Sequence, residues 1–97
     1  MMARFVLSPR AQADLDKIWD YSAEAWGDDR TERYIHEVWQ AIKSVAKNPR
    51  HGSSCDDIRT GYFKYAIGSH FLFYRLIPDG IDVVRILHQR MDFERHL

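Results

Sequence analysis

The chain has 97 residues, of which 45% are hydrophobic and 29% are charged, an ordinary composition for one globular domain. Fourteen Lys and Arg side chains balance fourteen Asp and Glu side chains. A neutral chain has no overall field that would attract nucleic acid or a membrane surface. We therefore expect a single domain over residues 1–97 that binds a protein partner and does not bind nucleic acid sequence-specifically.

The cysteine content and the hydropathy of the chain indicate its cellular compartment. Cys55 is the only cysteine, so no intrachain disulfide can form, which fits a reducing compartment. The first ten residues lack the apolar run of a signal peptide. No segment approaches the run of about 20 apolar residues that spans a bilayer. We expect a cytoplasmic protein without a membrane partner.

A short strand and a long helix are predicted first. Arg4 to Leu7 is an apolar run that stops at Ser8-Pro9. Ser8 suits a helix N-cap and Pro9 suits the first helical position, where no amide partner is needed. The positions that repeat at helical spacing on the apolar face are Ala11, Leu15, Ile18, Trp19, Ser22, Ala25 and Trp26. We place Asp14, Asp16 and Asp20 on a solvated face.

A second helix follows the interruption at Gly27. Asp28 or Asp29 is the predicted N-cap. Its apolar stripe consists of Ile35, Val38, Ile42, Val45 and Ala46, flanked by Tyr34 and Trp39. Asn48-Pro49 ends the helix, because the residue before proline avoids the helical region. Two long helices joined by so few residues predict an antiparallel helical hairpin.

Strands and turns fill the rest of the chain. The expected elements are a loop over 50–57, an extended run over 58–67 broken near Gly61, a two-residue turn at Gly68-Ser69, a strand over 70–76, a turn over 78–80, a strand over 81–88 and a tail over 89–97.

The element order predicts an α+β fold, β-α-α-β-β-β. Strands joined by tight turns make the sheet mainly antiparallel. The helical hairpin must bury its apolar stripes against one face of this sheet. A single helical layer leaves the opposite face open, so we expect a partner there or in a groove at its border with the helices.

The residues offer little for catalysis or cofactors. Cys55 and His51 are close in sequence, but nothing supplies the third group that a Cys–His pair needs. His70, His88 and His96 are dispersed, without the spacing of a metal site. No glycine-rich loop precedes a helix. We expect no metal, no cofactor and no catalytic residue.

Two arginines stand inside otherwise apolar strands. Burying an unpaired guanidinium costs several kcal/mol, so Arg75 and Arg85 must reach water, a ligand or a carboxylate such as Asp82, Asp56 or Asp57. A structural role and a binding role remain equally open. Regular alternation would place Arg85 on the face of Ile81, Val83 and Leu87, and His88 on the face of Asp82, Val84 and Ile86.

Three stretches in this order carry a family resemblance over nearly the whole chain. They are SPRAQADLDKIWDYSAEAWG, GYFKYAIGSHFLFYR and VVRILHQRMDFERHL. Together they resemble the ParE toxins of the RelE/ParE superfamily. The resemblance implies the toxin of a type II toxin–antitoxin pair, which inhibits DNA gyrase. It also implies a ParD-like antitoxin with a ribbon–helix–helix half, whose C-terminal tail folds onto the toxin.

The RelE branch of the same superfamily raises an alternative. Those relatives are ribosome-dependent mRNA endonucleases. His88 stands where some of the nucleases place a histidine, but Gln89 follows it and has no useful acid or base form. We interpret His88 as a scaffold or contact residue and the protein as a non-enzymatic toxin. A ribonuclease is the rival hypothesis, and a non-toxic member that only pairs with its antitoxin is a third.

Two surfaces follow as hypotheses from charge and expected exposure. The cationic C-terminal end predicts the target-binding surface, which consists of Arg85, His88, Arg90, Met91 and Arg95. Aromatic anchors are frequent at binding hot spots, and those predicted for the antitoxin are Trp39, Tyr62 and Tyr65. We expect a hetero-oligomer of toxin and antitoxin.

Overall fold

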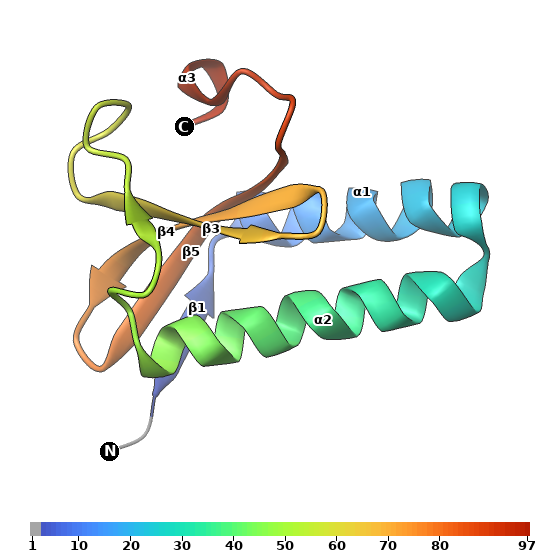
Figure 1. The fold of residues 1–97 in the computed structure, drawn as a ribbon, viewed down its shortest axis with the longest axis horizontal. Helices are drawn as coiled ribbons and strands as arrows, with labels where there is room; N and C mark the ends of the chain where they lie inside the picture. The colour runs from blue at the N-terminus through green and yellow to red at the C-terminus, as the bar shows by residue number, and fades with distance from the viewer. Residues whose placement is uncertain (1–2) are drawn as a thin grey trace.

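The computed structural model describes residues 3–97 and confirms the predicted α+β fold (Figure 1). Helices α1 and α2 run side by side, and their junction lies beyond the sheet. The elements in chain order are β1 (Arg4–Leu7), α1 (Pro9–Trp26), α2 (Asp28–Lys47), β2 (Ser53–Ser54), β3 (Tyr62–Ile67), β4 (His70–Ile77), β5 (Gly80–His88) and α3 (Phe93–His96).

The strands form one sheet in the order β1-β5-β4-β3-β2. Hairpins make β3, β4 and β5 antiparallel, as predicted, while β1 lies parallel to β5 at the sheet edge. Two boundaries differ from the prediction. The expected loop contains β2, which pairs Ser53 with Lys64. The run from Ile58 is a turn up to Gly61, because the amides of Ile58 and Arg59 both donate to the Cys55 carbonyl.

Ser8 caps α1 as predicted and also joins this helix to β5. Its Oγ accepts a hydrogen bond from the Ala11 amide at 3.1 Å and donates to the Val84 carbonyl at 2.8 Å. Its amide donates to the Val83 carbonyl at 2.9 Å. One residue therefore ends the β1 pairing and starts the helix.

Gly27 serves both helices of the hairpin. It is the C-cap of α1, where its amide donates to Ala23, and the N-cap of α2, with φ of 84°. The prediction that Asp28 or Asp29 caps α2 is wrong, since neither makes a capping hydrogen bond. Both lie in the first turn instead, where carboxylates favour the positive end of the helix dipole.

The main core lies between the helical hairpin and one face of the sheet. Its fully buried side chains include Val38 and Ile42 of α2, and Leu72, Tyr74 and Ile81 of the sheet. The two amphipathic stripes therefore pack where the sequence predicted. This layer fixes α1 beside β5, which positions the groove described below.

The opposite face of the sheet is covered, which corrects the expectation of an open face. Cys55, Phe73 and Leu87 are buried there, beneath Phe93 and Leu97. The chain turns back after β5, so that α3 lies across the sheet from the helical hairpin (Figure 1). A partner for this face must displace residues 89–97 or bind beside them.

A bulge in β5 overturns the predicted alternation. Phe73 pairs with Arg85 but Tyr74 pairs with Val83, so Val84 is the extra residue. An extra residue reverses the inside–outside pattern beyond it. As a result Val83 and Ile86 both enter the main core, whereas Val84 joins the opposite face.

In residues 3–97, every helix falls short of the length or the hydropathy required to cross a bilayer.

We predict that Ser8→Ala lowers the free energy of unfolding by about 1–2 kcal/mol, because the N-cap bond is lost and the Val84 carbonyl loses its donor. Urea denaturation measures this change. Ser44→Ala is the matched control at an exposed position inside α2, where alanine is the better helix former. Equal effects at the two serines would contradict the role given to Ser8.

Candidate functional site

A groove runs between α1, the end of β5 and the C-terminal segment, which we define as residues 89–97. We call it the α1–β5 groove, and its volume is about 590 Å³. Ile18, Tyr21 and Trp26 of α1 form one wall, and His88 and Met91 form part of the other. It is the concavity in the described chain that combines exposed aromatic groups with several cations.

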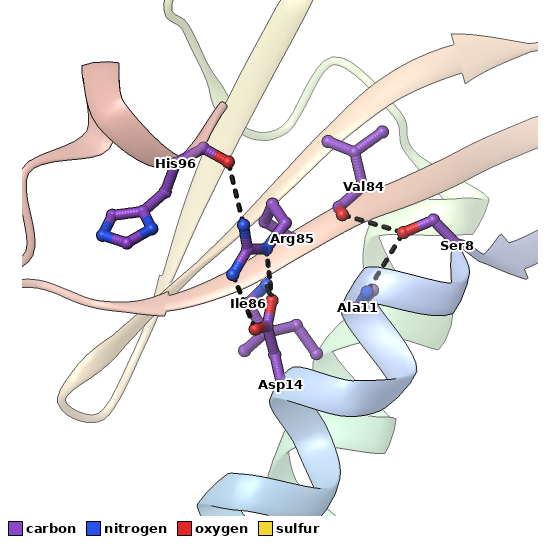
Figure 2. A network of polar contacts seen from close by, with 7 residues as sticks. All are labelled: Ser8, Ala11, Asp14, Val84, Arg85, Ile86 and His96. Carbon is purple, nitrogen blue, oxygen red and sulfur yellow. Dashed lines mark hydrogen bonds and ion pairs between the residues drawn. The ribbon is translucent and has the colours of Figure 1, made fainter.

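An ion pair between Asp14 and Arg85 lines this groove, and Figure 2 shows its contacts. Asp14 accepts from Arg85 Nε at 2.7 Å, from Arg85 Nη2 at 2.8 Å and from the Ile86 amide at 3.0 Å. Hydrogen bonding to Asp14 raises the pKa of Arg85 above its ordinary value, while burial acts in the opposite direction. The prediction that Asp14 is solvated is wrong, because its residue is only 7% exposed.

The two strand arginines have different partners. Arg75 Nε donates to Asp82 at 2.9 Å, which confirms one of the predicted pairings. Arg85 pairs with Asp14, a residue the sequence did not suggest, rather than with Asp82, Asp56 or Asp57. The side chain of Arg75 is 56% exposed and that of Arg85 is 12% exposed. Only Arg85 is therefore a buried charge that depends on its partner.

Two histidines meet beside the groove. The ring centroids of His70 and His88 are 5.3 Å apart. The Tyr34 hydroxyl oxygen lies 2.6 Å from His70 Nδ1 and 3.1 Å from the Ile67 carbonyl, and its single proton can be donated to only one of them. Burial raises the pKa of Tyr34. Burial and the neighbouring His88 lower the pKa of His70 from 6.5 to about 4, partly offset by Asp14. His70 is thus neutral near pH 7.

The histidine pair is a weak arrangement for acid–base catalysis. His88 Nδ1 accepts a hydrogen bond from the Arg90 amide at 3.1 Å. Gln89 donates to the Gly68 carbonyl at 3.0 Å, so it fastens the β3–β4 turn. The guanidinium of Arg85 is already committed to Asp14. No proton donor, acceptor and free cation converge on one point among these side chains.

The other candidates for reactive chemistry lie apart from the groove. Cys55 is buried against Phe73 and Leu87, and burial raises the pKa of its thiol, with Lys64 acting in the opposite direction. A buried, protonated thiol is a poor nucleophile. His51 packs against Tyr65 instead. Within residues 3–97, no three His, Cys, Asp or Glu side chains are placed to hold a metal ion.

The residues predicted for target binding lie at the end of β5 and in the C-terminal segment. Arg90 and Arg95 are exposed, while His88 and Met91 are half-buried at the groove. Arg85 lies beneath them. Of the five predicted side chains, Arg90 and Arg95 are therefore exposed cations, whereas the guanidinium of Arg85 is paired with Asp14.

Comparison with known proteins identifies the family. The model of the ParE toxin of the type II toxin–antitoxin system parDE matches residues 5–93. The chain belongs to the ParE toxin family. It is 54% identical over 98 residues to Toxin ParE1 of Mycobacterium tuberculosis strain H37Rv, with full coverage of both chains. It is 40% identical over 96 residues to Toxin ParE1 of Caulobacter vibrioides, with 99% of both chains covered.

A solved structure shares the fold of this ParE-family toxin. The chromosomal ParDE toxin–antitoxin system from P. aeruginosa contains a chain that superposes with a TM-score of 0.77. The match covers 90% of this chain and 96% of that chain at 18% identity. At 18% identity this match shows a shared fold and gives no information on individual residues. Roles for the groove residues therefore rest on their contacts in this structure.

The predicted antitoxin anchors of the toxin do not form one surface. Trp39 packs against Phe5 at the margin of the main core, with ring centroids 6.0 Å apart. Tyr65 also borders that core, whereas Tyr62 lies on the opposite face of the sheet beside Arg59. All three are half-buried. Trp39 lies beside β1, at the edge of the sheet opposite to β2, so the three side chains are spread over both faces and across the width of the sheet.

Sequence reasoning did not predict that aromatic side chains of α1 would be exposed at the groove. Tyr21 is 72% exposed and Trp26 is 37% exposed. Trp26 belongs to the predicted apolar stripe, but α1 extends past the sheet at this end (Figure 1). The spacing places Tyr21 on the polar face of α1. A large aromatic ring on a solvated face is unusual, and this was the one sequence signal that Tyr21 belongs to a binding surface.

We predict that acid destabilises the toxin through His70. Its pKa is lower in the folded state, so the unfolded chain binds the proton first and the free energy of unfolding falls as the pH drops from about 6.5 to about 4. His70→Asn keeps an acceptor for Tyr34 but cannot titrate, so it should flatten this slope. Urea titrations at several pH values measure it.

His36→Asn is the matched control, because this histidine is exposed on α2. It should leave the pH dependence unchanged. A slope that stays the same in His70→Asn would show that the burial of His70 has no such effect on stability.

Proposed function

We propose that this ParE-family toxin inhibits DNA gyrase through protein contacts in the cytoplasm. The main support is the setting of His88, whose Nδ1 accepts from the Arg90 amide. The neighbouring His70 is neutral near pH 7, and the Arg85 guanidinium is paired with Asp14. Membership of the ParE family supports gyrase as the target. In this proposal the toxin inhibits gyrase by binding to it and catalyses no reaction.

The proposed gyrase-binding surface consists of His88, Arg90, Met91 and Arg95, with Arg85 beneath them. Arg90 and Arg95 are exposed cations, and Met91 adds an adaptable apolar group. Arginines and apolar side chains of this kind are enriched at protein interfaces. The surface is carried largely by the C-terminal segment, so its shape depends on how that segment is held.

A ParD-like ribbon–helix–helix antitoxin is the proposed neutralising partner, in a hetero-oligomer. We assign its toxin-binding segment to the α1–β5 groove. Arg10 and Lys17 line the groove, and its single carboxylate, Asp14, is already paired with Arg85. With Tyr21 and Trp26 exposed alongside these cations, the groove fits an acidic segment that carries apolar side chains.

The same partner extends over the predicted anchors in this proposal. Trp39 and Tyr65 lie at the hairpin side of the sheet and Tyr62 on the other side. An extended tail that follows the β2–β3 edge reaches Tyr62 and Tyr65, and its passage beneath the sheet along α2 leads to Trp39, which lies beside β1. Occupation of the groove also covers His88 and Met91, so this proposal expects antitoxin and gyrase to exclude each other.

The gyrase proposal predicts that the purified toxin abolishes supercoiling by gyrase or stabilises its cleaved complex with DNA. His88→Ala should weaken this inhibition by less than about fivefold, the usual effect of one peripheral contact. Supercoiling assays on relaxed plasmid measure both. Cleavage of mRNA at the ribosomal A site, lost entirely in a folded His88→Ala variant, would instead establish the ribonuclease.

The antitoxin proposal predicts that Lys17→Glu weakens binding of the antitoxin encoded in the neighbouring reading frame by about tenfold, because a like charge then faces its acidic segment. Calorimetric titration measures the affinity. Lys43→Glu makes the same charge change on the exposed side of α2, away from the groove. Equal losses for both variants would refute the groove as the binding site.

A further inference from the structure

Asp14 is a buried carboxylate whose two oxygens both accept hydrogen bonds within the protein. It lies on α1, almost fully buried, and both of its oxygens are engaged (Figure 2). Oδ2 accepts from Arg85 Nε and from the Ile86 amide, and Oδ1 accepts from Arg85 Nη2. The two bonds from Arg85 form a fork, which fixes the plane of the guanidinium.

The opposite side of that guanidinium reaches the C-terminal segment. Arg85 Nη1 donates to the backbone carbonyl of His96 at 2.9 Å. Because the fork on Asp14 sets the guanidinium plane, it also sets the direction of this third bond. Figure 2 shows α1, β5 and the last turn of the chain meeting at this one side chain. The contact to His96 uses a backbone atom, so it acts on the position of the segment itself.

Gln89 fastens the start of the C-terminal segment to the β3–β4 turn, through its side chain to Gly68 and its amide to Ser69. Farther along the segment, the attachments other than Arg85 are weaker guides to its position. Phe93 packs against Phe71 and Phe73, with ring centroids 5.6 and 4.8 Å apart. Apolar contacts of this kind are not directional and allow the segment to slide. Arg59 donates to the Leu97 carbonyl at 2.6 Å, but Arg59 is exposed. Helix α3 has only four residues, too few for independent helical stability.

We infer that Asp14 is a positioning residue that holds the C-terminal segment in place through Arg85. The inference rests on the proposed function where it concerns gyrase, since it makes Asp14 necessary for the shape of the surface that carries Arg90, Met91 and Arg95. Asp14 itself touches no target. Without its carboxylate, Arg85 turns toward water and releases the His96 carbonyl, because an unpaired buried guanidinium is costly.

The first test measures hydrogen–deuterium exchange in the full-length toxin. In Asp14→Asn, amides of residues 93–97 should exchange about tenfold faster than in the unmodified chain, the factor for losing one hydrogen bond to a charged group. Amides of β3 and β4 serve as an internal reference and should stay protected. Unchanged exchange in 93–97 would overturn the inference.

A second variant covers the possibility that Asp14→Asn does not fold. The double variant Asp14→Asn/Arg85→Met removes both buried charges, an exchange that is commonly tolerated. It cannot bond to the His96 carbonyl, so exchange in residues 93–97 should rise as in the single variant. Arg75→Gln is the matched control, because it breaks the exposed ion pair with Asp82 in the same sheet. It should leave the segment protected.

A double-mutant cycle with a shortened chain links the effect to the segment. Removal of His96 and Leu97 deletes the acceptor of the third Arg85 bond. If Asp14 acts through that bond, Asp14→Asn should weaken gyrase inhibition in the full chain but add nothing in the shortened chain. Additive losses would overturn the positioning role, because they would mean that Asp14 acts independently of the segment.

The gyrase measurement tests the proposed function and the exchange measurement tests the inference, so either can be refuted without the other. If the unmodified toxin does not inhibit gyrase, the proposed function is wrong, and the exchange data still decide whether Asp14 holds the segment. If the toxin inhibits gyrase and exchange in residues 93–97 does not respond to Asp14→Asn, the inference is wrong and the proposed function stands.

Discussion

Strand β5 is longer than its neighbour β1, and much of the structure follows from how its uncovered edge is paired. The last β1–β5 pair is Leu7 with Val83. Beyond it, two side chains take the place of a strand: the N-cap residue Ser8 donates to the Val84 carbonyl, and Asp14 of α1 accepts from the Ile86 amide. A carboxylate in that position requires a cation, which Arg85 supplies. The same arginine then fixes the C-terminal segment, so the sheet edge and the proposed gyrase surface share one network.

The parts of the fold that depend on local signals could be predicted from the sequence. Ser8-Pro9, Gly27 and Asn48-Pro49 delimit the two helices, and the turns at 68–69 and 78–80 delimit the hairpins. The parts that depend on distant contacts could not. Asp14 borders the apolar stripe of α1 by spacing, where it is equally compatible with water, and its partner is 71 positions away. The bulge at Val84 has no marker such as glycine, so regular alternation was the reasonable expectation.

The candidate site shows the same division. Charge alone drew attention to Arg85, but only its contacts separate a supporting role from a binding role. Arg90 and Arg95 remain exposed cations, as the sequence suggested. The open face expected from a single helical layer is instead covered by Phe93 and Leu97, because nine residues after β5 suffice to return across the sheet. The same return brings Met91 and His96 into the lining of the α1–β5 groove, a placement no local pattern encodes.

The parallel pairing of β1 with β5 has a consequence for the nascent chain. Phe5 finds its strand partner only when Ile81 has been synthesised, and Asp14 finds the Ile86 amide 72 positions later in the chain. Contacts of such long sequence separation form late and slow folding. A ribosome-bound fragment that contains only the helical hairpin therefore carries an exposed apolar stripe and no finished sheet. The proposed gyrase-binding surface follows β5 in the sequence, so it forms only after these late contacts of β5 can be made.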